Sequence, residues 1–134
     1  MKTKDIGTLG EDIAERYLKK RGYKILSRNY SCRGGEIDSI CFRFGKLVFV
    51  EVKARSNDLF GRPADAVDTE KIKKIKKAAH DFSINHVRNG KVSVFYPFGI
   101  ELKRRINKKQ IDVIEVFLSE ENRINHIKDW KKRL

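Results

Sequence analysis

The sequence predicts a mixed α/β domain with an antiparallel hairpin at its centre and helices on both faces of its sheet. Apolar residues recur at three- and four-residue spacing over 5–21 and 65–87, which predicts two helices. Apolar runs at 40–44 and 47–50 flank a glycine-containing turn, which predicts a hairpin. Both faces of that hairpin carry apolar residues, and such strands need cover on two sides.

The first predicted helix, 5–21, carries glycines within its apolar stripe. Gly7 and Gly10 lack side chains there, so the helix can approach a sheet closely. Gly22 is the predicted C-terminal stop. Glu11 lies at the edge of the stripe, in a half-buried position from which it can look over the edge of the sheet.

The predicted central hairpin joins strands 36–44 and 46–55, after a first strand at 23–30. With Gly45-Lys46 as a type II′ turn, Phe44 pairs with Leu47 and Asp38 with Lys53. Asp38, Glu51 and Lys53 then share one face, and a register change of two residues keeps them there. The apolar positions divide into Ile40, Phe42, Leu47 and Phe49 on one face and Ile37, Cys41, Val48 and Val50 on the other.

The remaining elements follow from shorter patterns. After a loop at 56–64, the second helix, 65–87, has a buried stripe and a lysine-rich outer surface. The predictions for the rest of the chain are a strand at 91–98, a basic turn at 103–109, a strand at 110–118 and an amphipathic helix at 123–134 that carries Trp130. The predicted order is therefore α-β-β-β-α-β-β-α.

Composition favours one soluble domain over residues 1–134. Hydrophobic residues make up 40% of the chain and charged residues 37%, which is typical of a globular protein. Charged residues interrupt the N-terminus, so no signal sequence and no membrane span are expected, and we expect a cytoplasmic protein. Cys32 and Cys41 match no metal spacing, and Cys41 is interpreted as a buried reduced thiol.

The net charge of +13, from 31 basic and 18 acidic residues, makes a polyanion the expected partner. The basic residues are spread over several segments rather than along one amphipathic helix with aromatic residues. Nucleic acid is therefore favoured over an anionic membrane.

The acids of the hairpin suggest a chemistry. Mg²⁺ binds one or two carboxylates, keeps several waters and accepts phosphate oxygens, so Asp38 and Glu51 are candidate ligands, joined by the main-chain carbonyl of Val52. Lys53 would stabilise phosphate charge or orient the attacking water, and Glu11 would supply a third carboxylate.

Each of these features also has a structural explanation. A Glu-x-Lys pair is common, and an acid and a lysine on adjacent strands can form a simple cross-strand ion pair. The lysines at 71–77 fit a solvated helix face as well as a DNA contact. His80, His86 and His126 show no ligand spacing.

The segment GTLGEDIAERYLKKRGYKILSRNYSCRGGEIDSICFRFGKLVFVEVKARS (7–56), with its continuation to about residue 82, resembles the YraN-like family of predicted nucleases. That family is similar to archaeal Holliday junction resolvases and belongs to the PD-(D/E)xK, restriction-endonuclease-like superfamily. The resemblance implies an αβββαβ core, with Glu11 at the helix acid position, Asp38 at the conserved acid, and Glu51 and Lys53 as the ExK pair. The segment 110–113 (QIDV) is similar to a later family strand, although its first two residues differ from the family's.

The resemblance implies a Mg²⁺- or Mn²⁺-dependent endonuclease that cleaves structured or branched DNA, with DNA favoured over RNA. Arg55, Lys71 and Lys74 are the predicted contacts to the nucleic-acid backbone. Junction resolvases use two active sites, so a homodimer is expected by analogy. A non-catalytic nucleic-acid-binding or scaffold protein that retains the nuclease fold is the alternative, and RNA processing or ribosome association is a third option.

Overall fold

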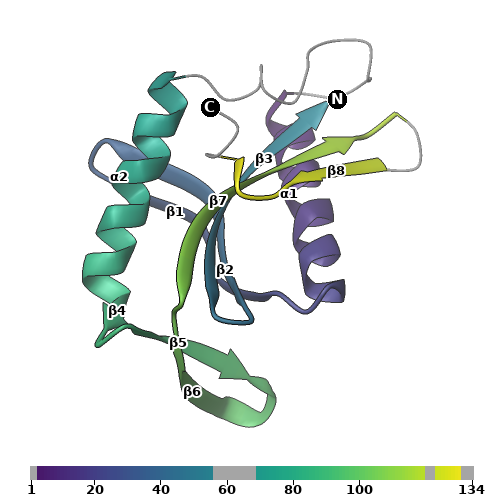
Figure 1. The fold of residues 1–134 in the computed structure, drawn as a ribbon. Coiled ribbons are helices and arrows are strands. Elements are labelled where there is room, and N and C mark those ends of the chain that lie inside the picture. The colour runs from purple at the N-terminus through teal and green to yellow at the C-terminus, as the bar shows by residue number, and fades with distance from the viewer. Residues whose placement is uncertain (1–2, 56–68, 120–122, 131–134) are drawn as a thin grey trace.

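The computed structural model describes residues 3–55, 69–119 and 123–130. Two helices lie on opposite faces of a five-stranded mixed sheet, and a small second sheet projects from one end (Figure 1). The helices are α1 (Thr3–Lys20) and α2 (Thr69–His86), with a short 3₁₀ turn, η2, at Pro97–Gly99. The strands are β1 (Lys24–Cys32), β2 (Gly35–Arg43), β3 (Lys46–Arg55), β4 (Val87–Arg88), β5 (Lys91–Tyr96), β6 (Ile100–Arg105), β7 (Lys108–Phe117) and β8 (Arg123–Ile127). Neither described helix has the length and apolar character needed to cross a bilayer.

Helix α1 ends where its sequence predicts. Gly22 adopts a φ of 86° and donates to the carbonyl of Lys19, while the Tyr23 N–H donates to the carbonyl of Leu18. This pair of bonds is a Schellman cap, which satisfies carbonyls that the helix leaves without partners. A Cβ placed on Gly10 would lie 2.6 Å from Cβ of Ala54 in β3, so this glycine does allow a close approach. Gly7 faces open space and has no such role.

The main sheet has the strand order β1-β2-β3-β7-β8. Adjacent strands are antiparallel except for β3 and β7, which pair in parallel from Lys46↔Lys108 to Arg55↔Phe117. The core α1-β1-β2-β3-α2-β7 agrees with the predicted αβββαβ order and with the restriction-endonuclease-like arrangement. Strands β3 and β7 therefore form the buried centre of the sheet.

The predicted register of the β2–β3 hairpin is wrong by two residues. Phe44 and Gly45 form the turn, with φ values of 46° and 78°, so Phe42 rather than Phe44 pairs with Leu47. Two successive positive φ values are typical of a type I′ turn, whose twist matches that of the strands better than other two-residue turns. As expected for a shift of two, residues of β3 keep their predicted faces.

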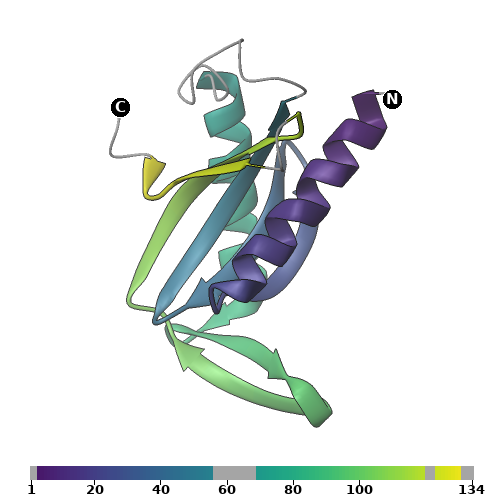
Figure 2. The same ribbon diagram turned by 90° about the vertical axis from the view of Figure 1, so that its right-hand side faces the viewer.

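Each helix covers its own apolar cluster, and Figure 2 shows the sheet between the two helices. The α1 side buries Leu18, Cys41, Val48 and Val50, and the α2 side buries Ile40, Phe42, Phe49 and Phe82. Ile37 belongs to the α2 side, contrary to the simple alternation that predicts it opposite Ile40. The prediction of helices on both faces is confirmed.

The C-terminal third differs most from expectation. The predicted basic turn at 103–109 is wrong, because strand β6 occupies 100–105 and pairs with β5, and β7 begins at Lys108. The predicted helix at 123–134 is also wrong in its described part, because β8 pairs with β7 from Val113↔Ile127 to Phe117↔Arg123. Trp130 is buried in the α2-side cluster. The predicted loop at 56–64 and the start of the predicted second helix lie outside the described residues.

Candidate active site

Asp38 lies where strands β2 and β3 stop pairing. Their ladder runs from Arg43↔Lys46 to Ser39↔Val50. Beyond it, Oδ2 of Asp38 accepts a hydrogen bond of 2.8 Å from the Val52 N–H. A side chain thus takes the place of a backbone acceptor, and Asp38 is held against β3 with its second carboxylate oxygen not used in this bond.

Glu51 is fully buried on the α2 side of β3, with a relative exposure of 0%. Within the described part of the chain no well-aligned hydrogen bond reaches its carboxylate oxygens, although the Lys71 ammonium lies 3.0 Å from Oε2. The pKa of Glu51 is raised to about 8, chiefly by burial and then by the neighbouring Asp38 carboxyl, against the opposing effect of Lys71. Buried carboxylates are normally hydrogen-bonded, so this arrangement is costly for the fold.

Lys71 lies in the first turn of α2, and its ammonium forms an ion pair with the Glu51 carboxylate. Its Nζ lies 3.0 Å from Oε2 of Glu51 and 3.1 Å from Oε1 of Glu36. Burial lowers the pKa of the Lys71 ammonium, but the two glutamates outweigh that effect and the pKa is raised. A cation therefore already lies against the buried carboxylate.

Three lysines, Lys53, Lys71 and Lys74, act electrostatically on Glu36. The hydrogen bond from Lys71 lowers the pKa of Glu36, and the charges of Lys74 and Lys53 lower it further. Lys53, two residues after Glu51, is half-buried. Lys71 therefore links Glu51 to Glu36, and the charges of the three lysines all act on this exposed acid.

Glu11 approaches the site from α1. Burial raises its pKa, and the charge of Asp38 raises it further, while Asn29 and Arg28 act in the opposite direction. Arg28 of β1 reaches the same helix, with its Nη2 3.6 Å from Glu11 and 2.6 Å from Asp12. Glu11 thus lies within electrostatic range of Asp38 while it is held by an arginine.

The predicted acids are therefore linked through Asp38, which perturbs both Glu11 and Glu51. They do not form a complete metal cage, since no three acid, histidine or cysteine side chains of the described residues converge closely enough to hold an ion. Two carboxylates are enough for Mg²⁺, which usually completes its shell with water and substrate oxygens. The donor set fits a hard divalent cation of that kind.

Arg55, a predicted nucleic-acid contact, lies in an ion pair. Its Nε donates to Oε2 of Glu115 in β7 at 2.8 Å, and Asn125 of β8 donates to Oε1 of the same carboxylate at 3.1 Å. Glu115 is 1% exposed, so β7 contains a second buried glutamate, and this one has donors on both oxygens. Lys71 is likewise paired, whereas Lys74 is exposed.

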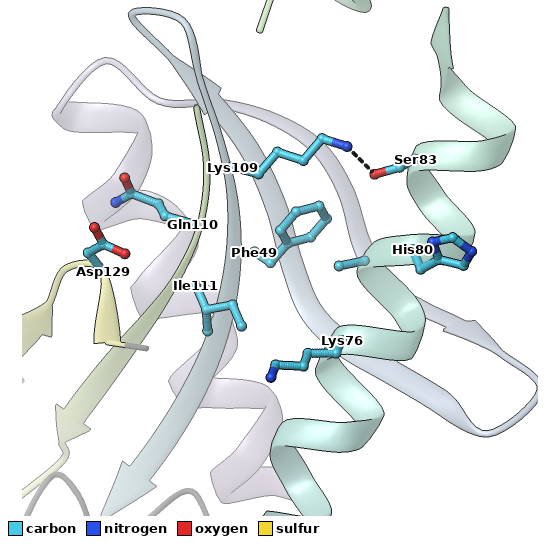
Figure 3. Close-up of a pocket in the computed structure, with 9 residues that line it drawn as sticks. Phe49, Lys76, His80, Ser83, Lys109, Gln110, Ile111 and Asp129 are labelled. Carbon is cyan, nitrogen blue, oxygen red and sulfur yellow. Dashed lines mark hydrogen bonds between the residues drawn. The ribbon is translucent and has the colours of Figure 1, made fainter. Parts of the chain in front are cut away.

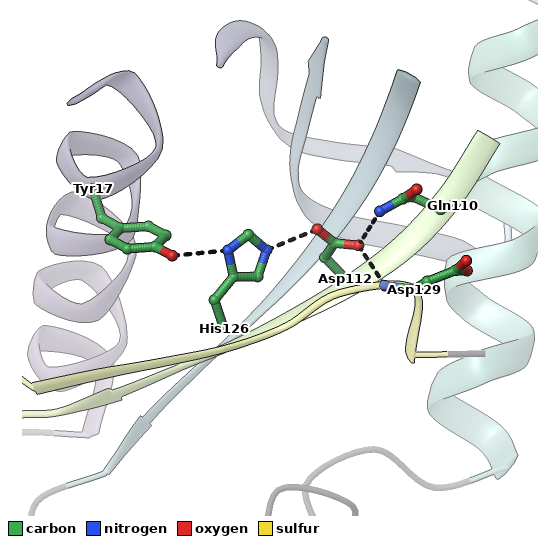
Figure 4. A network of polar contacts seen from close by, with 5 residues as sticks. All are labelled: Tyr17, Gln110, Asp112, His126 and Asp129. Atoms are coloured by element: carbon green, nitrogen blue, oxygen red, sulfur yellow. Dashed lines mark hydrogen bonds and ion pairs between the residues drawn. The ribbon is translucent and has the colours of Figure 1, made fainter. Parts of the chain in front are cut away.

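A buried network of polar side chains, which the sequence pattern does not predict, surrounds Asp112 of β7. Asp112 of β7 accepts from Gln110 at 2.8 Å and from the Asp129 N–H at 2.9 Å, and its Oδ2 lies 2.7 Å from Nε2 of His126 (Figure 4). Nδ1 of His126 lies 2.9 Å from the hydroxyl of Tyr17 in α1. The network ties β7, β8 and α1 together. In the sequence, Asp112 of the segment 110–113 is the residue that points to this network.

A separate hollow of about 250 Å³ lies between α2 and β7 (Figure 3). Phe49 forms part of its wall, and Lys109 donates to Ser83 across it at 3.0 Å. None of the four predicted active-site residues lines it. The hollow is therefore distinct from the acids.

The fold and the acids define a class: a mixed α/β domain that places two carboxylates where its central strands separate. The chain belongs to the family described as "Uncharacterised protein family UPF0102", the YraN family, whose model matches residues 10–116. It is 38% identical to the UPF0102 protein TTE1452 of Caldanaerobacter subterraneus subsp. tengcongensis, over 92% of each chain. It is 40% identical to a UPF0102 protein of Clostridium beijerinckii, over 94% of this chain and 92% of the relative. A relative from Caldicellulosiruptor bescii is 39% identical, over 96% of this chain and 98% of its own.

Proposed function

We propose that this protein is a metal-dependent endonuclease that hydrolyses phosphodiester bonds of structured or branched DNA. The observation that carries the proposal is the fully buried Glu51 carboxylate, which lies beside a second acid and forms an ion pair with the Lys71 ammonium. Perturbed carboxyl groups of this kind are concentrated at functional sites. A bound divalent cation would add positive charge beside both acids, of which Glu51 is already paired with Lys71.

Asp38 and Glu51 are the proposed ligands of Mg²⁺ or Mn²⁺. The Val52 N–H points to Asp38, and in a strand the carbonyl of the same residue points to the same side. The Val52 carbonyl therefore faces the gap beyond the β2–β3 ladder and is a proposed third ligand. When bound, the cation would acidify a coordinated water and neutralise charge on the phosphate.

The lysines of the site complete the proposed chemistry. Lys53 follows Glu51 on the same face of β3, and in this proposal it would orient the attacking water or hold a phosphate oxygen. Lys71 and Lys74 extend that positive charge along α2, and Glu11 supports the site from the other side through Asp38. Hydrolysis adds water to phosphorus and breaks one P–O ester bond, which leaves a phosphate monoester and a hydroxyl.

A non-catalytic nucleic-acid-binding or scaffold protein is the second candidate. The complete burial of Glu51 and its ion pair with Lys71 favour it, because a structural ion pair also perturbs pKa values. This candidate predicts binding that weakens steeply with salt and no turnover with any metal.

The test is cleavage by the purified protein with Mn²⁺ on branched, duplex and single-stranded substrates. Asp38→Asn and Glu51→Gln should abolish cleavage while DNA binding persists or tightens. Glu115→Gln is the matched control, since it alters a buried glutamate of the neighbouring strand that has its own donors. If a folded Asp38→Asn or Glu51→Gln protein cuts as fast as the wild type, the assignment is wrong. Calorimetric titration with Mn²⁺ separates the two candidates: heat lost in Asp38→Asn supports the nuclease, and no heat in either protein supports the scaffold.

A further inference from the structure

Two hairpin turns of this protein carry the same unusual pair of residues. Phe44-Gly45 joins β2 to β3 with φ values of 46° and 78°, and Phe98-Gly99 lies between β5 and β6 with φ values of 67° and 75°. Asn or Gly usually occupies the first position of such a pair, because other side chains clash in the left-handed region. A phenylalanine there costs about 1–3 kcal/mol.

Neither phenylalanine ring packs in the core, so burial does not offset this backbone strain. Phe98 is fully exposed and Phe44 is 82% exposed. Phe95, at the end of β5, is also exposed. Apolar rings held on tight turns in an unfavourable backbone conformation indicate a role outside the fold, since local strain is concentrated at functional positions.

The two turns lie at the same end of the molecule, hereafter called the hairpin end, which consists of the 44–45 turn and the β5–β6 hairpin with its 97–99 turn (Figures 1 and 2). The Asn107 N–H donates to the Gly45 carbonyl at 2.7 Å and so ties the first turn to the base of the second hairpin. Glu51 is six residues from Gly45 along β3, which corresponds to about 20 Å. The hairpin end is thus separate from the acids and fixed relative to them.

Charge identifies the kind of partner. Residues 88–105, from the end of β4 to the end of β6, contain five basic and one acidic residue, so this segment carries +4 of the net charge of +13. The acid, Glu101, is paired with Lys103 at 3.1 Å, and all six residues of β6 are exposed. A second copy of the chain would face this charge with the same charge, whereas a polyanion complements it. Aromatic rings combined with positive charge are typical of surfaces that stack on nucleic-acid bases.

We propose that the hairpin end binds unpaired bases of DNA: the Phe98 ring stacks on them, with Phe44 as a second stacking ring, while the basic residues of 88–105 contact phosphates. The choice of DNA rests on the proposed function. At about 3.4 Å per base pair, the roughly 20 Å from Glu51 to the 44–45 turn corresponds to about six base pairs, and Phe98 lies farther out, beyond the six residues of β6. The enzyme would thereby recognise a junction or bulge at one end and cut at the other.

The test is binding of a duplex with a two-base bulge that carries 2-aminopurine, measured in EDTA with the Glu51→Gln background so that no strand is cut. Phe98→Asn removes the ring and suits the turn, so it should fold at least as well as wild type and bind the bulge about 5- to 100-fold more weakly. Phe98→Trp should retain affinity and the quenching of 2-aminopurine, and Phe98→Leu should lose both. Phe44→Asn should weaken binding less.

Undiminished bulge affinity in folded Phe98→Asn, or full affinity in Phe98→Leu, would overturn the proposal. So would a wild-type dimer in sedimentation that Phe98→Asn converts to monomer, because the ring would then belong to a protein interface. A Phe98-dependent loss of bulge binding, together with no cleavage by the wild-type protein with Mn²⁺, would support this proposal and count against the nuclease, so the two can fail separately.

Discussion

Replacing Glu51 by glutamine should make the protein more stable, although it removes a proposed catalytic residue. Folding takes this carboxyl from a pKa of 4.5 to about 8, chiefly through burial. Between these values the folded protein keeps a proton that the unfolded chain has lost, so stability falls as pH rises from 4.5 to 8 and is level above. A neutral glutamine avoids this loss.

The magnitude follows from the shift. Each pH unit within the window costs about 1.4 kcal/mol, so the upper limit is about 3 kcal/mol at pH 7 and about 5 kcal/mol above pH 8. Water entry and small relaxations reduce such costs in real proteins. We therefore expect Glu51→Gln to raise the free energy of unfolding by about 1–3 kcal/mol at pH 8 and by close to zero at pH 4.5. Lys71 keeps its contact with Glu36, so the substitution leaves no lone buried charge.

Glu115→Gln is the matched control. Glu115 is as buried as Glu51 and lies on the adjacent strand, but Arg55 and Asn125 donate to its two oxygens. Its replacement should lower the free energy of unfolding by about 1–3 kcal/mol, because hydrogen bonds to a charged group are weakened. The two substitutions thus make the same chemical change with opposite predicted signs.

Urea unfolding of the three proteins, followed by circular dichroism from pH 4.5 to 9, measures both effects. The gap between Glu51→Gln and wild type should widen steadily up to pH 8. A loss of stability in Glu51→Gln equal to that in Glu115→Gln, or a gap that does not vary with pH, would show that the Glu51 carboxylate is well satisfied and would refute the reasoning.

Three further predictions concern other parts of the fold. Gly10→Ala should cost about 1–3 kcal/mol by overpacking against β3, whereas Gly7→Ala, which meets open space, should stabilise α1 by up to about 1 kcal/mol; thermal melts of both compare them. Lys71→Ala should raise Mn²⁺ affinity about tenfold in calorimetry by removing a competing cation, and unchanged affinity there, or an equal gain in the control Lys74→Ala, would count against the metal site. His126→Ala should lower the free energy of unfolding in urea by about 1–3 kcal/mol, because it removes a hydrogen-bonding partner of the buried Asp112 carboxylate, and an unchanged free energy would contradict that role.

Much of the fold could be predicted because burial leaves a periodic pattern. The stripe of α1, its glycine stop and the apolar strands of the hairpin all repeat at the spacing of the element they form. The pair Asp38 and Glu51 could be predicted for a related reason, since acids that interrupt such strands stand out. Lys71 was expected at a phosphate instead, because an ion pair across 20 residues leaves no local pattern.

The elements that were missed leave no such pattern. The segment 123–130 has apolar residues at 124, 127 and 130, a spacing that suits a helix, yet pairing with the edge of β7 makes 123–127 the strand β8. The Asp112–His126 contact depends on that pairing, so it could not be inferred without β8. Strand β6 is exposed along its whole length and therefore lacks the alternation by which a strand is recognised.

The error of two residues in the predicted β2–β3 register and the failure to predict strand β6 have a common cause in the two turns of the hairpin end. Gly45 marks a turn but does not indicate whether it takes the first or second turn position, and a phenylalanine before it argues against the left-handed conformation that Phe44 adopts. Phe98 contradicts the same local rule in the other hairpin. Sequences follow local rules where only the fold is at stake, and departures without a packing benefit are expected at functional positions. Two such departures, both exposed and both at one basic end of the molecule, are better explained by a shared ligand than by two separate accidents of folding.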